Sequence, residues 1–296
     1  MIFEFLKAVL FGIVEGITEW LPVSSTGHLI LLDEFLRLNV APSLGREFAE
    51  EFMEMFKVVI QLGAILAVVV VFFSKLNPFF PQKDLIQKKA TWSLWFKVAV
   101  ASIPAAIVGI LFDKILEAKT GKDIDGWLYN AVVVALALII YGILFIVIER
   151  ANKNKEYKVT DVSEISYKNA LLIGVFQMLA IIPGTSRSGS TILGSMCMGL
   201  SRGAAAEFSF FLAIPAMLGA SAIKVLGFLS YIGESGVDIP VSAFAVLLVG
   251  MAVAFVVSLV TIKFLMDFVK KHSFSSFGIY RIILGVLVLL YFIIFA

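Results

Sequence analysis

Long apolar runs dominate the chain and are separated by short polar segments. A helix that crosses a bilayer needs roughly 20 predominantly apolar residues with few charges. Six runs meet this requirement, so we predict membrane spans at about 54–74, 93–112, 127–149, 203–229, 241–266 and 278–296. The pattern therefore predicts an all-α integral membrane protein.

Two further apolar regions, 3–38 and 167–200, are interrupted near their middle. Each holds an apolar helix, a hydroxyl-rich bend and a second helix, and each helix has only roughly 14–18 residues, which is marginal for crossing a bilayer. Pro22 stands in the first bend and Pro183-Gly184 in the second, and these residue types interrupt helices. We predict two re-entrant hairpins that enter and leave by the same face. Their irregular backbone must be buried in protein or line a wet cavity.

The composition agrees with a membrane protein and argues against other classes. Of the 296 residues, 60% are hydrophobic and 16% are charged, against about 45–50% and 25% in soluble domains. The net charge of +2 is too small to indicate nucleic-acid binding. Cys197 is the one cysteine of the chain. No internal disulfide can therefore form, and we expect no cysteine-based metal site.

Basic residues are distributed unevenly between the loops and predict the orientation of the chain. Lysine and arginine concentrate in the segments 75–90, 150–168 and 267–277, whereas the segments 113–126 and 230–240 have no such excess. Basic loops favour the cytoplasmic side of a membrane. This places both termini outside, with the first hairpin entering from the outer face and the second from the cytoplasmic face.

The two interrupted regions resemble each other in sequence. A shift of 162 positions without a gap aligns Gly12 with Gly174, Glu15 with Gln177, Ser24 with Ser186, Thr26 with Ser188 and Gly27 with Gly189. Each hairpin precedes three spans, and a unit with an odd number of crossings takes opposite orientations when it is repeated once. We therefore predict one membrane domain, 1–296, built from two inverted halves, 1–150 and 151–296.

The hairpins carry an unusual concentration of ionisable residues. Glu15 and Glu19 lie four positions apart, so they share one face of a helix, and His28 follows them. Arg187 lies in the second hairpin and Arg202 at the start of the next span. An ionisable residue near the bilayer centre costs about 2.5–3.5 kcal/mol on insertion scales, so five together approach the roughly 5–15 kcal/mol stability of a whole domain. We infer that these groups compensate one another and serve a function.

Hydroxyl groups cluster at the bend of each hairpin, where the second helix begins. They are Ser24, Ser25 and Thr26 in the first hairpin, and Ser186, Ser188 and Thr191 in the second. A helix N-terminus presents unpaired N–H groups and a partial positive charge, which suit an anion, and Arg187 adds a planar charged group suited to phosphate oxygens. Any one of the serines could serve only as an N-cap, but that does not account for Arg187. We predict one anion-binding site between the two hairpins.

Two acids beside an anion site indicate a phosphate group together with a divalent cation. Mg²⁺ usually binds one or two carboxylates and substrate phosphate oxygens, so Glu15 and Glu19 are candidate metal ligands. Ser25 or His28 could supply a nucleophile or a proton relay for phosphoryl transfer, and their spacing does not choose between them. Arg202 is either a substrate contact or an anchor on the cytoplasmic side.

These residues form motifs that closely resemble those of a known family, the undecaprenyl-diphosphate phosphatases of the BacA/UppP type. The motifs are Glu15-x-x-x-Glu19, Leu21-Pro-Val-Ser-Ser-Thr-Gly-His28, Val59-Ile-Gln-Leu-Gly63, Pro183-Gly-x-Ser-Arg-Ser188 with Thr191, and Ser201-Arg202 followed by Glu207-Phe-Ser209. The resemblance covers essentially the whole chain, and together the motifs are highly specific. We see no departure from the family pattern in either hairpin.

The resemblance implies a phosphoric anhydride hydrolase of the bacterial plasma (inner) membrane. Such an enzyme converts undecaprenyl diphosphate to undecaprenyl phosphate and inorganic phosphate, depends on Mg²⁺ or Ca²⁺, recycles the lipid carrier for cell-wall synthesis and confers bacitracin resistance. By position, Glu15 and Glu19 would bind metal or act as acid and base, Ser25 would be the favoured nucleophile with His28 as rival or relay, and Ser186, Arg187 and Thr191 would hold the diphosphate. The active site would face the outer (periplasmic) side.

Two alternative functions stay open from the residues alone. An inverted repeat with broken helices and a midplane anion site is also a common design of transporters, so the chain could move a lipid phosphate between leaflets as a flippase. A type-2 phosphatidate phosphatase is disfavoured. The motif of that family ends in Ser-Gly-His, whereas here both Thr26 and Gly27 stand between Ser25 and His28. Membrane lipids are expected partners, nucleic acid is not, and the oligomeric state stays open, with a homodimer among the alternatives.

Overall fold

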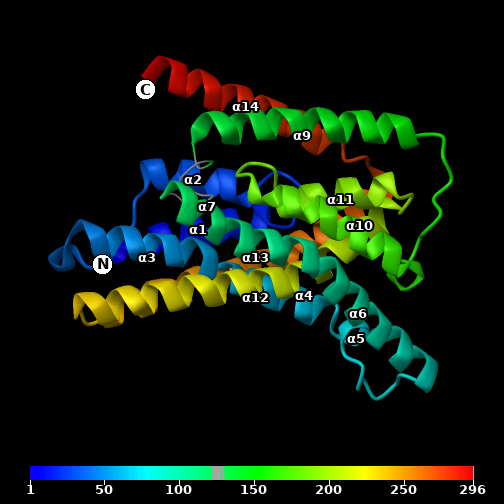
Figure 1. Ribbon diagram of the computed structural model, residues 1–296, viewed down its shortest axis with the longest axis horizontal. Helices are drawn as coiled ribbons and strands as arrows, with labels where there is room; N and C mark the ends of the chain where they lie inside the picture. The colour runs from blue at the N-terminus through cyan, green and yellow to red at the C-terminus, as the bar shows by residue number, and fades with distance from the viewer. Residues whose placement is uncertain (122–127, 129, 296) are drawn as a thin grey trace.

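A computed structural model shows a helical protein (Figure 1) and describes residues 1–121, 128 and 130–295. The helices up to residue 152 are α1 (Ile2–Thr18), α2 (Ser25–Phe35), η1 (Pro42–Leu44), α3 (Gly45–Val59), α4 (Gln61–Val71), α5 (Phe73–Leu76), α6 (Leu85–Ile107), the π-helix η2 (Val108–Phe112), α7 (Asp113–Thr120) and α9 (Ala131–Asn152). The later helices are η3 (Val162–Glu164), α10 (Tyr167–Met178), η4 (Leu179–Ile181), α11 (Arg187–Cys197), α12 (Arg202–Ser235), α13 (Val241–Lys271) and α14 (Ser275–Phe295). Residues 122–127, which include the end of the predicted 113–126 loop and the start of the predicted 127–149 span, lie outside the described residues.

Six helical stretches among the described residues are long and apolar enough to cross a membrane. They are Pro42–Val71, Leu85–Thr120, Val132–Asn152, Arg202–Ser235, Val241–Lys271 and Ser275–Ile294. The first begins well before the predicted residue 54, because α3 is amphipathic and buries Phe48, Phe52 and Phe56 on one face. Residues four apart share a face of a helix, so α3 can pack on the bundle although its other face is charged. The predicted all-α membrane fold is confirmed.

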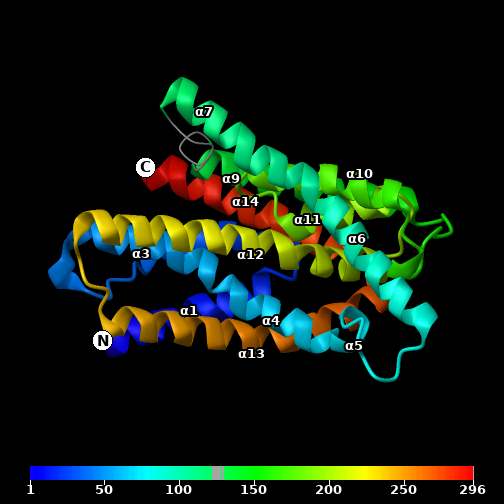
Figure 2. The ribbon, with the colours of Figure 1, turned by 60° about the horizontal axis from the view of Figure 1, so that its bottom comes forward.

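The two interrupted regions form helical hairpins that point in opposite directions. Both chain termini lie at one end of the bundle in Figures 1 and 2. α1 starts at this end and α2 returns to it, whereas α10 starts at the opposite end and α11 returns there. The segments 77–84 and 153–166, which belong to the predicted basic loops, also lie at that opposite end. The hairpin tips therefore approach each other in the interior of the bundle.

Glycines allow the first helix of each hairpin to approach a long helix from the other half of the chain. α1 packs along α13, and α10 packs along α6. A Cβ atom on Gly12 would lie 2.6 Å from the Gly250 carbonyl oxygen in α13, and one on Gly174 would lie 2.2 Å from the Ala101 carbonyl oxygen in α6. No side chain fits at such distances, so these two glycines set the depth at which the hairpins are held.

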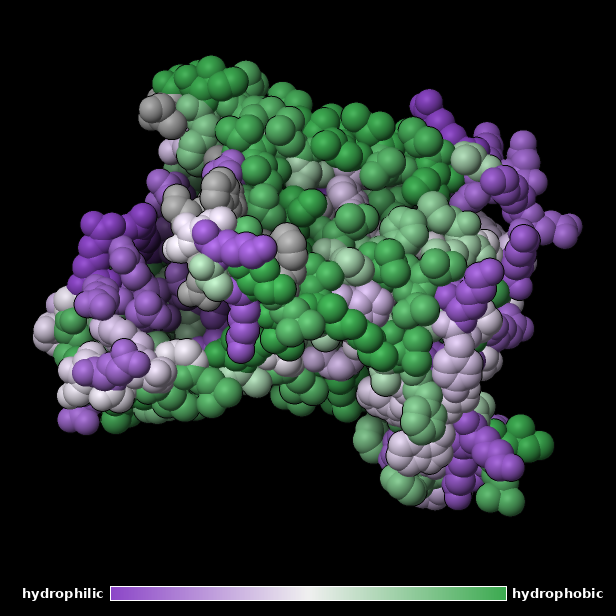
Figure 3. Space-filling model, in the orientation of Figure 1, coloured by the Kyte–Doolittle hydropathy of each residue, from purple (hydrophilic) through white to green (hydrophobic). Residues whose placement is uncertain are grey.

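Hydrophobic side chains cover the outside of the bundle as well as its inside. Figure 3 shows a broad hydrophobic band between two hydrophilic ends, as expected for a surface that faces lipid. The interior near the hairpin tips is aromatic: Trp20 is fully buried and its ring meets that of Phe210 in α12 edge to face, with centroids 5.2 Å apart. This packing gives the first hairpin tip a rigid support.

Candidate active site

Each hairpin turns at a serine with an unusual backbone conformation. Ser24 has φ 74° and Ser186 has φ 69°, and among the described residues these are the two non-glycine residues with positive φ. This conformation is strained for a residue with a side chain. Each serine also caps the next helix: Ser24 Oγ accepts from Gly27 N at 3.3 Å, and Ser186 Oγ accepts from Gly189 N at 3.1 Å. The caps offset the strain and fix where α2 and α11 begin.

The two hairpins meet at an ion pair. Glu19 follows the last residue of α1, and Arg187 is the first residue of α11. Arg187 Nη2 donates to Glu19 Oε1 at 2.9 Å, and the two side chains are only 12% and 6% exposed. Arg187 Nη1 donates to the Ser209 carbonyl of α12 at 2.8 Å, which fixes the orientation of the guanidinium group. The structure thus brings the acid of one hairpin into contact with the arginine of the other.

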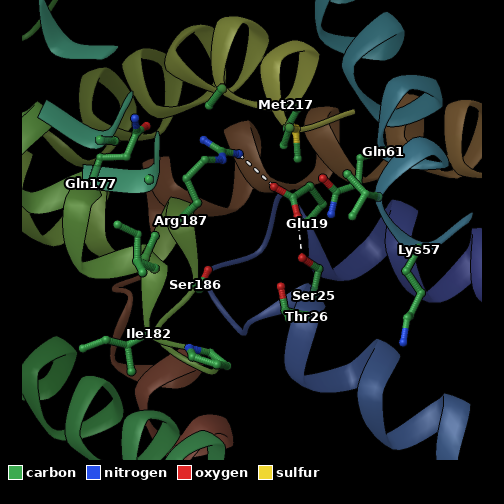
Figure 4. A pocket seen from close by; sticks show the side chains of 18 of the residues that line it. Glu19, Ser25, Thr26, Lys57, Gln61, Gln177, Ile182, Ser186, Arg187 and Met217 are labelled. Atoms are coloured by element: carbon green, nitrogen blue, oxygen red, sulfur yellow. Dashed lines mark hydrogen bonds and ion pairs between the residues drawn. The ribbon is translucent and has the colours of Figure 1, made fainter. Parts of the chain in front are cut away.

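Ser25 shares the carboxylate of Glu19 with Arg187. Its hydroxyl donates to Glu19 Oε2, while the arginine occupies Oε1. Figure 4 shows Glu19 between the two side chains, with the hydroxyl of Thr26 close to that of Ser25. Ser25 is the first residue of α2, so its hydroxyl lies at a helix N-terminus, where negative charge is stabilised. A carboxylate that accepts a hydrogen bond from a serine is placed to accept its proton.

A pocket of about 850 Å³ contains this ion pair. Its walls come from the two hairpin tips, from α3 and α4, from α6 with η2, and from α12. The predicted site residues that line it are Glu19, Ser25, Thr26, Ser186 and Arg187. Glu54 and Lys224 line the pocket and form an ion pair at 3.0 Å between α3 and α12, with side chains 59% and 37% exposed, so the pocket reaches solvent beside them. α3 begins and α12 ends at the end of the bundle that carries both termini, where Figure 3 shows a recess rimmed by hydrophilic residues.

Several buried polar atoms near the ion pair have no hydrogen-bond partner among the described residues, and two of the side chains that carry them are acidic or amide groups. Both carboxylate oxygens of Glu15, which is fully buried one turn before Glu19, are unpartnered. Gln177 lines the pocket, is 3% exposed, and its Oε1 is also unpartnered. A buried carboxylate without a partner is costly unless it binds a proton or a cation. Two carboxylates one turn apart are a donor set that Mg²⁺ can use together with phosphate oxygens. Glu19 lines the pocket and Glu15 lies behind it, and the described residues hold no group of three or more His, Cys, Asp or Glu side chains that could bind a metal.

Three predicted substrate-binding hydroxyls are held by the protein and do not line the pocket. Ser24 forms the cap described above. Ser188 Oγ donates to the Glu19 carbonyl at 3.1 Å, and Thr191 Oγ1 donates to the Arg187 carbonyl at 2.9 Å. All three side chains are buried. Ser188 therefore joins the two tips, and Ser24 and Thr191 stabilise the helices on which they lie. Thr26 and Ser186 are the hydroxyls that line the pocket beside Ser25.

His28 and Arg202 lie in other contacts. His28 Nε2 is 2.7 Å from the Tyr280 hydroxyl of α14, the two rings are stacked, and the histidine does not line the pocket. Arg202 makes two hydrogen bonds to Glu149 of α9, at 2.8 and 2.6 Å, at the end of the bundle opposite the termini. This position favours the anchoring interpretation of Arg202. A catalytic role for His28 stays a prediction.

Sequence reasoning missed a buried arginine that joins the hairpins. Arg281 of α14 is fully buried inside the predicted span 278–296. Its Nη1 donates to the Pro22 carbonyl at 3.1 Å, and its Nη2 donates to the Gly184 and Thr185 carbonyls at 2.7 and 2.9 Å. One side chain therefore binds the backbone of both tips. An ionisable residue within a predicted span was the signal that could have identified it.

Further polar residues of the pocket were also missed. The pocket is also lined by Lys57 and Gln61, on the span that contains α3 and α4, and by Lys224 of α12. Two of the three are lysines inside apolar runs, which by itself marks them as functional candidates. Gln61 lies in the quoted motif that begins at Val59, but no role followed from it.

Comparison with known proteins identifies the family of this chain. The family model described as Bacitracin resistance protein BacA matches residues 8–287. An undecaprenyl-diphosphatase from Enterococcus faecalis is 57% identical over 289 residues, which cover 97% of this chain and 96% of the relative. Undecaprenyl-diphosphatase 1 of Clostridioides difficile (strain 630) is 55% identical over 289 residues, 98% of this chain and 96% of the relative. An undecaprenyl-diphosphatase from Desulfitobacterium hafniense is 53% identical over 290 residues, with the same shares. The match to the family model and to these full-length relatives shows that the chain belongs to the BacA family of bacitracin resistance proteins.

Proposed function

We propose that this protein hydrolyses undecaprenyl diphosphate to undecaprenyl phosphate and inorganic phosphate, and thereby recycles the lipid carrier of cell-wall synthesis and confers bacitracin resistance. The observation that carries the proposal is the shared carboxylate of Glu19, which accepts from Ser25 on one oxygen and from Arg187 on the other. The proposed nucleophile Ser25, its base Glu19 and the phosphate-binding guanidinium group of Arg187 thus share one pocket. The names of the relatives agree with this reaction.

Ser25 is the nucleophile that the geometry favours. Its hydroxyl attacks the terminal phosphorus, its proton passes to Glu19 Oε2, and the bond from phosphorus to the bridging oxygen breaks. The lipid monophosphate leaves with that oxygen. Water then attacks the phosphoserine, releases inorganic phosphate and restores the Ser25 hydroxyl. In-line transfer of this kind depends mainly on positioning and on stabilising the charge of the phosphoryl oxygens.

The pocket supplies that stabilisation from both hairpins. α2 and α11 begin at Ser25 and Arg187, so two helix N-termini face the phosphoryl group. Arg187 provides a fixed positive charge, and the hydroxyls of Thr26 and Ser186 are available as donors. Preorganised donors in a buried site are worth far more than the same donors in water. The apolar tail of the lipid stays among the membrane-facing helices.

A divalent cation, Mg²⁺ or Ca²⁺, completes the proposed site. Glu15 and Glu19 would hold it, because Glu15 is an unpartnered buried carboxylate and Glu19 lies one turn further along the helix. When bound, such an ion neutralises charge on the diphosphate oxygens.

We infer that the two halves form an inverted repeat and that the pocket opens outside the cell. The matched glycines Gly12 and Gly174, the matched caps Ser24 and Ser186, and the opposite entry of the hairpins support the repeat. The basic loops at the end opposite the termini support an outward-facing pocket in the bacterial plasma membrane. In a Cys197→Ser background, a cysteine placed at Gly236 should react with a membrane-impermeant thiol reagent in intact cells. A cysteine at Lys271 should react only after the cells are lysed. The reverse pattern would overturn the orientation.

Purified protein in detergent tests the reaction against the transporter alternative. Because detergent has no leaflets, a flippase leaves undecaprenyl diphosphate intact there, whereas a hydrolase releases inorganic phosphate. We expect phosphate release by the wild-type chain and none by Glu19→Ala. An intact substrate with both proteins would reject the hydrolase.

A further inference from the structure

Lys57 lines the pocket but pairs with a residue outside it. Lys57 lies on α3, one helical turn before Gln61, and both line the pocket. Its Nζ donates to Asp33 Oδ2 of α2 at 2.8 Å, and the two side chains are 20% and 23% exposed. Asp33 is not among the described residues that line the pocket. Figure 4 shows Lys57 on the far side of Ser25 and Thr26 from Arg187.

The charges of the described lining residues leave one positive charge over. Arg187 is paired with Glu19, and Lys224 is paired with Glu54, and all four line the pocket. The fifth charged lining residue is Lys57, whose counter-charge lies outside the lining. A ligand in the pocket can therefore contact Lys57 without contacting the carboxylate that neutralises it. The charge of Lys57 is partly shielded from solvent, so screening weakens it less than it weakens an exposed charge.

We propose that Lys57 binds the lipid-linked phosphate of the diphosphate, the phosphate that does not react. The inference rests on the proposed function. Ser25 and Arg187 hold the terminal phosphoryl group at the hairpin tips, so the second phosphate extends along the wall of the pocket. Lys57 lies along that wall on the side of Ser25 away from Arg187. A lysine ammonium has three donors, so one can bind Asp33 while others bind phosphate oxygens.

Asp33 has a defined part in this arrangement. It holds Lys57 in place when the pocket is empty, and it competes with the phosphate for the ammonium group when substrate binds. Removing the competing carboxylate leaves the positive charge for the substrate. Lys57 therefore sets substrate affinity and belongs to the binding machinery, and Asp33 is a positioning residue that tunes that affinity.

Two substitutions break the same ion pair and separate this role from a structural one. Lys57→Met and Asp33→Asn both remove the contact between α2 and α3, so a purely structural pair would shift the kinetics in the same direction. If Lys57 binds phosphate, Lys57→Met raises the KM for undecaprenyl diphosphate in detergent about tenfold with kcat changed less than about threefold. Asp33→Asn lowers that KM by about twofold or more, and Lys57→Arg retains most of the wild-type affinity.

Arg46→Met is the matched control. Arg46 lies on the same helix and is ion-paired with Glu50 at 2.6 Å, but it does not line the pocket. The KM of Arg46→Met for undecaprenyl diphosphate should equal that of the wild type. If Lys57→Met fails to fold, Asp33→Asn decides by itself, because an unchanged or raised KM overturns the proposal. A wild-type chain that releases no phosphate rejects the proposed function, whereas an active wild type with equal or parallel KM shifts in the two variants rejects the role of Lys57 alone.

Discussion

Glu19 and Arg187 are separated by 168 positions in the chain, yet Arg187 Nη2 donates to Glu19 Oε1 at 2.9 Å. This contact joins the C-terminal end of α1 to the first residue of α11, across two hairpins that enter from opposite ends of the bundle. The same carboxylate accepts from Ser25. Glu19 thus links the guanidinium group of Arg187 in the second hairpin with the hydroxyl of Ser25 in the first.

Replacing Glu19 by Gln should reduce kcat for phosphate release about 100-fold or more, because an amide cannot accept the proton of Ser25. The amide keeps the shape of the carboxylate, so the protein should still insert and fold. Phosphate release in detergent and elution on size exclusion measure the two effects.

Arg187→Ala should lose activity to a similar degree through loss of charge stabilisation. Near-normal turnover in either variant would refute the assigned roles.

Ser25→Ala should abolish the phosphorylated enzyme intermediate and lower kcat by about 100-fold or more. His28→Asn should retain much more activity, because the imidazole contacts Tyr280 and does not line the pocket. Rapid acid quenching followed by peptide mapping identifies the modified side chain. A phosphate found on His28, or substantial activity in Ser25→Ala, would make the histidine or a water molecule the better nucleophile.

Arg281→Met should destabilise the protein by about 3–5 kcal/mol, because three backbone carbonyls of the hairpin tips lose a charged donor. Activity should fall with it, since Pro22 of one tip and Gly184 of the other are then held less firmly. Thermal unfolding in detergent and phosphate release measure the two effects. Ile283→Val, which changes an exposed residue of α14, serves as the control. An unchanged Tm in Arg281→Met would argue against the joining role.

Gly174→Val should destabilise the fold by about 1–3 kcal/mol or more, because its Cβ would lie 2.2 Å from the Ala101 carbonyl oxygen. Gly219→Ala is the matched control on α12, where a Cβ meets nothing within 4 Å. Its Tm should be unchanged or slightly raised. The measurement is thermal unfolding of the two variants side by side, and equal Tm values would show that α10 can move away from α6 without cost.

Treatment with a chelator should stop phosphate release, and added Mg²⁺ or Ca²⁺ should restore it. Glu15→Gln should raise the Mg²⁺ concentration for half-maximal activity about tenfold or more, because one of the two proposed carboxylate ligands becomes neutral. A Mg²⁺ titration of activity in the wild type and the variant measures this shift. Glu4→Gln, an acid near the start of the same helix that pairs with Lys7, should leave the titration unchanged. Full activity in the presence of the chelator would exclude a metal at this site.

The sequence by itself determined the membrane class, the six spans and the two hairpins. These follow from the length of apolar runs and from the position of Pro22 and Pro183-Gly184, which are local properties of the chain. The clusters of acids, hydroxyls and arginine also marked both hairpin bends as a candidate phosphate site. A charge inside an apolar run is informative wherever it occurs, and by this rule Lys57 and Arg281 were visible as well.

Only the tertiary structure decided which of these side chains share the pocket. Ser25 and Ser24 are neighbours in the chain, but one contacts Glu19 in the pocket and the other caps α2. That difference depends on the positive φ of the turn, which residue type alone does not dictate. The contacts of Arg187 with Glu19, and of Arg281 with both tips, depend on how distant segments pack against each other. Local sequence sets where a helix begins and ends, whereas the direction of a side chain at a strained turn is set by the helices that hold the turn in place.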